Sequence, residues 1–149
     1  FGHLRYATSG IDRSEALRNA HPVVKGGKTI DKGNHIYHID CDAALIHNGQ
    51  VDVKRASLLP HSEGIGFDTE ALLSHLIVKG YRKTLEEIPG SYFLAFAEKG
   101  KDIIVMRDRH GMMPGVFGLK DGEYVFASED IALRENGAKN IRNAEPGRA

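Results

Sequence analysis

The short sequence His47-Asn48-Gly49 combines residue types that can stabilise a negatively charged oxygen. It follows an apolar run from Ala43 to Ile46, which predicts a buried strand, and Asn-Gly is typical of a sharp turn at a strand end. An asparagine amide beside a glycine N–H can direct two donors at one point, as in an oxyanion hole. Asn-Gly is also among the commonest hairpin turns, so a purely structural role stands beside this chemical one.

Arg5 and Asp68 are charged residues at positions that allow either a structural or a binding role. Arg5 lies in a strand-like segment, where a guanidinium is either solvated and ion-paired or a bidentate fork for a carboxylate. Asp68 begins the clearest predicted helix, whose apolar stripe includes Leu72, Leu73 and Leu76. A carboxylate there caps free N–H groups and suits the helix dipole, and Gly80 is expected to end this helix.

Potential zinc ligands occur at His35, His38 and Cys41. A spacing of three residues along a strand places successive members on opposite faces of the sheet. Cys41 is therefore expected to be a small buried hydrophobic residue, and no metal site is predicted.

The composition excludes several classes of partner. The 149 residues are long enough for one domain, and 41% hydrophobic with 27% charged residues is ordinary for a globular protein. Twenty basic residues balance twenty acidic ones, which favours neither nucleic acid nor an anionic membrane as a partner. A single cysteine fits a reducing, cytoplasmic location, and no apolar run approaches the ~20 residues of a membrane span.

The order of the predicted elements indicates an α+β fold, because strands and helices do not alternate. A hairpin is expected from 35–39 and 43–47, with a helix at 68–78 and a short one at 82–87. Residues 11–34 show no sustained period and are interpreted as a long loop or two short elements, with a lid over a small-molecule site as the functional alternative. Ser128 is expected to cap a helix at 129–135, and further strands are predicted at 91–97, 102–107, 115–119, 124–128 and 139–144.

Six short motifs follow one another along the chain. They are Gly2-His3-x-Arg5-Tyr6-x-Thr8-x-Gly10, His47-Asn48-Gly49, Asp68-Thr69-Glu70, Arg107-Asp108-x-His110-Gly111-x-x-Pro114, Ala127-Ser128-Glu129 and Glu145-Pro146-Gly147. In this order they resemble the motifs of class II glutamine amidotransferase domains. Among these domains, the motifs look most like those of the glutaminase domain of glutamine phosphoribosylpyrophosphate amidotransferase, the first committed enzyme of purine synthesis.

This resemblance implies the four-layer αββα sandwich of the N-terminal-nucleophile hydrolases. The implied reaction is hydrolysis of the glutamine side-chain amide by an N-terminal cysteine, which releases ammonia. By position in the motifs, Arg5 would hold the glutamine α-carboxylate, with Tyr6 and Thr8 beside it. Asp68 would hold the α-ammonium, while Asn48 and Gly49 would form the oxyanion hole.

The sequence departs from the family at its beginning. Phe1 is no nucleophile, and the family's cysteine, first strand and following helix lie upstream of Gly2. Residues 1–149 are therefore interpreted as a partial glutaminase domain that is inactive alone, without the C-terminal synthase domain. L-Glutamine, the phosphoribosyltransferase domain of the parent chain and a homo-oligomer are the expected partners. No cofactor is expected here, and magnesium would belong only to the synthase domain.

Three alternatives remain beside the interpretation as a glutaminase domain of purine synthesis. The chain could be the glutaminase domain of a hexosephosphate aminotransferase or of a glutamate synthase, which share the module. It could be a non-catalytic glutamine-binding or scaffold module. It could also be an unrelated α+β domain.

Overall fold

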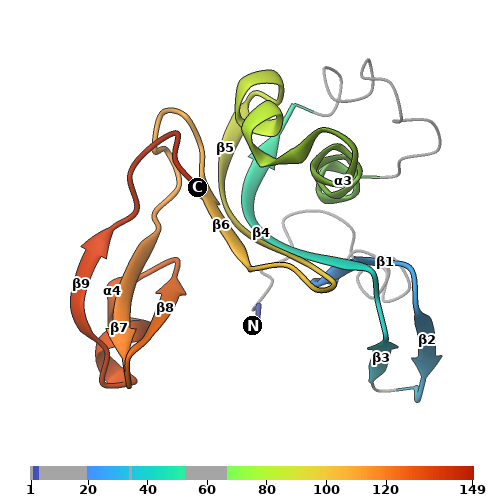
Figure 1. The fold of residues 1–149 in the computed structure, drawn as a ribbon, viewed down its shortest axis with the longest axis horizontal. Coiled ribbons are helices and arrows are strands. Elements are labelled where there is room, and N and C mark those ends of the chain that lie inside the picture. The colour runs from blue at the N-terminus through green and yellow to red at the C-terminus, as the bar shows by residue number, and fades with distance from the viewer. Residues whose placement is uncertain (1, 4–19, 34, 53–66) are drawn as a thin grey trace.

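The computed structural model describes residues 2–3, 20–33, 35–52 and 67–149 (Figure 1). The strands form a four-stranded sheet in the order β1-β4-β5-β6, a three-stranded sheet in the order β8-β7-β9, and a separate hairpin, β2-β3. All of these neighbouring strands are antiparallel, which confirms the predicted α+β class. The elements are β1 (Val23–Lys25), β2 (Lys28–Asp31), β3 (Ile36–Ile39), β4 (Ala43–Val51), α3 (Asp68–Glu87), β5 (Gly90–Glu98), β6 (Ile104–Arg107), β7 (Val116–Lys120), β8 (Glu123–Ala127), α4 (Asp130–Glu135) and β9 (Lys139–Asn143).

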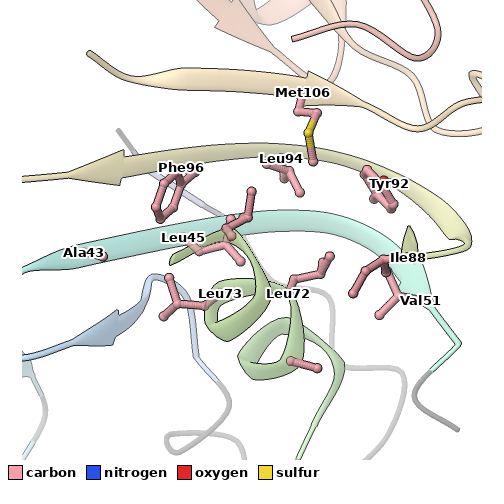
Figure 2. Packing of buried hydrophobic residues seen from close by; sticks show 12 residues of the cluster. Ala43, Leu45, Val51, Leu72, Leu73, Ile88, Tyr92, Leu94, Phe96 and Met106 are labelled. Atoms are coloured by element: carbon pink, nitrogen blue, oxygen red, sulfur yellow. The ribbon is translucent and has the colours of Figure 1, made fainter. Parts of the chain in front are cut away.

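The core lies between α3 and the four-stranded sheet. β4 and β5 pair along their whole length, and alternate side chains such as Leu45 and Leu94 face the helix. Figure 2 shows Leu72 and Leu73 of α3 in the space between the helix and the strand that carries Leu45. Each such side chain is almost completely buried, and burial of one leucine contributes about 1.5–3 kcal/mol. This packing fixes the first turns of α3 against the middle of β4.

The predicted break in the helix at Gly80 is confirmed. Gly80 has φ 78° and ψ 168°, a non-helical conformation inside α3 that glycine adopts without steric cost. The Thr84 hydroxyl donates to the Gly80 carbonyl at 2.9 Å and lies 3.0 Å from His75 Nδ1. Glu87 lies 3.0 Å from His75 Nε2, so these side chains join the two halves of α3 across the kink.

The three-stranded sheet and α4 lie on the side of the four-stranded sheet away from α3 (Figure 1). Phe93 on β5 follows the buried Tyr92 and therefore points to this second face. A cavity of about 750 Å³ lies there, lined by Phe93, Val105, Phe117 and Phe126 among others. Both sheets therefore contribute side chains to the space between them.

The charged connection between β6 and β7 is held in place by hydrogen bonds from two side chains to the backbone. The buried Asp108 carboxylate accepts backbone N–H groups of Tyr92, His110, Met112 and Met113, all within 3.2 Å. The Arg107 guanidinium donates to the carbonyls of Met113, Gly111 and Ala144 at 2.7–2.8 Å. These contacts tie the connection to β5 and to the segment after β9, and backbone groups satisfy the charges of Asp108 and Arg107.

Two expectations about the first third of the chain are corrected. The predicted hairpin of 35–39 with 43–47 is wrong, because β3 pairs with β2 whereas β4 pairs with β1 and β5. Residues 20–33 carry β1 and β2, which agrees with two short elements in place of a single long loop. The rest of the proposed lid, residues 11–19 and 34, lies outside the described residues.

Candidate functional site

Asn48 and Gly49 lie within β4, not in a turn at its end. They pair with Phe93 and Tyr92 of β5, and the strand continues to Val51, so the predicted strand-end turn is wrong. Gly49 has φ 136°, and a Cβ there would collide with the Ser91 carbonyl oxygen and lie 2.7 Å from Tyr92 Cα. Glycine is thus required by the close approach of β5 and not by a reversal of the chain.

The side-chain amide of Asn48 is directed at the second sheet. Asn48 follows His47, which faces α3, and alternation along β4 places Asn48 on the other face. Its Nδ2 donates to Ser128 Oγ at 3.2 Å, just after β8. The prediction that Ser128 caps α4 is wrong, because the N-cap is Glu129, without a side-chain cap bond. Because an amide nitrogen carries two hydrogens, this bond orients Asn48 and leaves a second N–H able to donate.

Asp68 is the first residue of α3, one position after the N-cap Phe67. Asp68 therefore lies one residue inside the position of a helix cap. Its Oδ1 still accepts the free Thr69 N–H at 2.8 Å, as a capping carboxylate does. Its Oδ2 accepts a long bond of 3.4 Å from the Val51 N–H at the end of β4. The carboxylate thus joins the start of α3 to the strand that carries Asn48 and Gly49.

Arg5, Tyr6 and Thr8, which the resemblance assigns to glutamine binding, lie outside the described residues. Of the predicted site residues, the structure therefore positions Asn48, Gly49 and Asp68. Gly49 lies two residues from Val51, whose N–H contacts Asp68. The meeting of all these groups around one glutamine stays a prediction.

Histidines and a threonine that the sequence reasoning did not single out form a cluster beside Asp68, in which Thr69 and His47 are buried. His47 Nδ1 and His21 Nε2 lie 3.2 and 3.1 Å from Thr69 Oγ1, and the rings of His3 and His21 meet edge to face at a centroid distance of 4.3 Å. Burial lowers the pKa of His47 to about 4; the Asp68 charge opposes this shift and His3 adds to it. His47 is therefore neutral near pH 7. The sequence indicates this cluster only in that His47 and Thr69 belong to two of the six motifs that resemble the amidotransferase family.

Cys41, the only cysteine in the sequence, lies away from these groups. It precedes β4 by two residues and Asn48 by seven, which in extended chain is about 20 Å. A thiolate at that position cannot reach a carbonyl carbon held at Asn48. The described groups can therefore bind an amide oxygen and a cation, but they include no cysteine nucleophile at the site.

The described parts of the chain contain neither a metal-ligand group nor a helix that could span a membrane. Across residues 2–3, 20–33, 35–52 and 67–149, no group of His, Cys, Asp and Glu side chains is arranged to hold a metal ion. The helices in those same ranges are too short or too polar to cross a bilayer.

Comparison with known proteins matches residues 42–146 to the glutamine amidotransferase domain family. The amidophosphoribosyltransferase of Bacillus subtilis is 30% identical over 159 residues, which cover 98% of this chain and 30% of that enzyme. That of Methanothermobacter thermautotrophicus is 28% identical over 162 residues, covering 98% of this chain and 31% of the relative. This chain thus spans less than a third of the length of these relatives.

The fold agrees with this similarity. The structure of glutamine phosphoribosylpyrophosphate amidotransferase from B. subtilis, complexed with ADP and GMP, superposes with a TM-score of 0.70 and 26% identity. The match covers 97% of this chain and 30% of that one. By the family match over most of its length, this chain belongs to the glutamine amidotransferase domain family.

Proposed function

We propose that this chain is the glutamine-binding part of a glutaminase domain, and that the whole enzyme supplies ammonia to a phosphoribosyltransferase domain in purine nucleotide synthesis. The observation that carries this proposal is that Asp68, at the start of α3, contacts the N–H of Val51, on the strand that carries Asn48 and Gly49. A carboxylate at the end of a strand that carries amide donors suits a ligand with a cationic head and a neutral amide at its far end. The proposed arrangement of layers is the αββα sandwich of the N-terminal-nucleophile hydrolases.

In the proposed binding mode, Arg5 takes the α-carboxylate and Asp68 the α-ammonium. Tyr6 and Thr8 lie beside the carboxylate, and the Asn48 amide with the Gly49 N–H takes the side-chain oxygen. Opposite charges at the two ends of the amino-acid head exclude simple amides, which lack those charges. Support for Asn48 comes from its bond to Ser128, which holds the amide in one orientation.

In the proposed hydrolysis, a thiolate attacks the side-chain amide carbon and the carbonyl oxygen becomes negative. The two donors stabilise that oxygen more strongly than the ground-state carbonyl. Collapse of the intermediate breaks the C–N bond, the nitrogen leaves as ammonia after gaining a proton, and water then releases glutamate from the thioester. Cys41 is too far from Asn48 to be this thiol, so we expect the 149 residues to bind glutamine without turning it over.

The proposed acceptor of the ammonia is a phosphoribosyl group. The similarity to amidophosphoribosyltransferases, which covers 98% of the chain, favours this acceptor over others. A glutamine-binding module without catalysis is the second candidate. The remote position of the only cysteine in these 149 residues favours it, and measurement of ammonia release by the full-length gene product distinguishes the two.

Calorimetric titration of the chain with L-glutamine tests the binding. We expect saturable binding that Asp68→Asn weakens by at least tenfold, because an ion pair to the ammonium is lost. Asp130→Asn is the matched control, since Asp130 is likewise the first residue of a helix but pairs with Arg134 on the surface. Absence of binding to the unaltered chain, or equal losses in both variants, would overturn the proposal. Ammonia release above the buffer rate would instead show a nucleophile that we do not expect.

A further inference from the structure

Thr69 occupies the centre of the polar cluster at the start of α3. Its side chain is buried, with 2% of the residue exposed, and its hydroxyl oxygen contacts groups from different parts of the chain. Asp68 Oδ1 lies at 3.3 Å, His21 Nε2 at 3.1 Å and His47 Nδ1 at 3.2 Å. The amide N–H of Thr69 also donates to Asp68 Oδ1 at 2.8 Å.

The bonding capacity of a hydroxyl determines the direction of these contacts. A hydroxyl has one hydrogen to donate and two lone pairs to accept. An ionised carboxylate only accepts, so the Thr69 hydrogen goes to Asp68 and both histidine nitrogens donate to Thr69. His47 therefore carries its hydrogen on Nδ1, and the low pKa of its buried ring agrees with a neutral form. This arrangement uses every bonding position of the hydroxyl.

The same bonds leave the two oxygens of Asp68 unequal. Oδ1 accepts both the N–H and the hydroxyl of Thr69, whereas Oδ2 has one long bond of 3.4 Å, to Val51, in the described part of the chain. A bond of that length is weak. Oδ2 is thus the oxygen with capacity for a cationic donor, and the Thr69 hydroxyl opposes rotation of the carboxylate that would exchange the two.

We propose that Thr69 is a positioning residue that holds the Asp68 carboxylate with Oδ2 presented to the α-ammonium of the bound amino acid. This inference rests on the proposed binding of glutamine. Thr69 itself does not touch the ligand. His21 and His47 keep its hydroxyl in place, and through them residues from β4 and from the segment before β1 help to orient Asp68.

The test compares L-glutamine with glutaramate, the same molecule without the α-amino group. A positioning role for Asp68 affects only the ligand with an ammonium, whereas general loosening of the site weakens both. We expect Thr69→Val to reduce the ratio of the affinity for L-glutamine to that for glutaramate by roughly tenfold, because a hydrogen bond to the charged Asp68 is lost. Thr69→Ser keeps the hydroxyl and should retain the ratio.

Thr84→Val is the matched control. Thr84 lies in the same helix, is completely buried and also has a hydroxyl beside a histidine, but its partners are His75 and the Gly80 carbonyl. We expect this variant to be less stable with an unchanged affinity ratio. An unchanged ratio in Thr69→Val, or an equal reduction in Thr84→Val, overturns the inference.

A measurement on the unaltered chain tests the hydrogen-bond directions without any variant. Nitrogen-15 NMR of the imidazole rings at neutral pH should show neutral His47 with its hydrogen on Nδ1. A hydrogen on Nε2, or a charged ring, contradicts the assignment and overturns the inference. If the unaltered chain binds glutamine and Asp68→Asn removes the preference over glutaramate while Thr69→Val does not, the inference fails and the proposed function stands. If the unaltered chain binds no glutamine, both fail.

Discussion

The side-chain amide of Asn48 donates to Ser128 Oγ at 3.2 Å, although 80 positions separate the residues in the chain. This bond joins the middle of the four-stranded sheet to the segment between β8 and α4. It orients a proposed oxyanion donor from the opposite sheet, so the candidate site depends on how the two sheets are held together.

Removal of the Ser128 hydroxyl should therefore affect Asn48. We expect Ser128→Ala to lower the free energy of unfolding by about 1 kcal/mol, the usual net value of one hydrogen bond. Urea denaturation of Ser128→Ala, Asn48→Ala and the double variant measures the coupling between them, which should be about 0.5–1.5 kcal/mol. Strictly additive losses would show that the two side chains do not interact in solution.

Gly49→Ala should be among the most damaging single substitutions in the described chain. The new methyl group would meet the Ser91 carbonyl oxygen and the Tyr92 backbone, and φ 136° is strained for alanine. We expect a loss of about 3 kcal/mol or more in chemical denaturation. Gly122→Ala is the control, because Gly122 also has a positive φ of 88° but nothing lies within 4 Å of its Cβ position. Its loss should be only about 1 kcal/mol.

The buried His47 should make the fold less stable in mild acid. The unfolded chain takes up this proton below pH 6.5, whereas the folded chain resists it down to about pH 4. The unfolded state therefore binds more protons in this window, so the free energy of unfolding falls as the pH falls from 6.5 to 4. The total contribution is about 3 kcal/mol.

Urea titrations from pH 4 to 7 measure this dependence. His47→Gln removes the titrating group and should flatten the slope in that window. The exposed His110 provides the control, since His110→Gln should keep the slope of the unaltered chain. A slope that survives His47→Gln would assign the pH dependence to other groups.

Asp108→Asn tests the hydrogen bonds that hold the connection between β6 and β7. The pKa of Asp108 is lowered because backbone N–H bonds from Met113, Met112, His110 and Tyr92 outweigh the opposing effect of burial. An amide would point an NH₂ group at some of these donors, so we expect a loss of about 2–4 kcal/mol in thermal or urea unfolding. The exposed Asp102→Asn should change stability by less than about 0.5 kcal/mol.

The local patterns predicted much of the secondary structure and the family. Alternating apolar residues predicted β5 to β9 within a few positions, and the helical stripe around Leu72 predicted α3 together with its break at Gly80. These features depend on interactions between residues near in sequence, such as burial of alternate faces and the conformational freedom of glycine. The motifs indicated the family because their order along the chain is the order found in class II glutamine amidotransferase domains.

Tertiary structure alone decided the surroundings of Asn48 and Asp68. Asn-Gly looks like a turn by its local preference, but nine residues of β5 pair along β4 and extend the strand through Gly49. Ser128 looks like a helix cap, but it bonds to Asn48 in another sheet. The cluster of Thr69 with His21 and His47 forms between segments 22 to 48 positions apart. Such contacts arise because burial forces distant polar groups to pair with one another, and no local pattern records which partner each will meet.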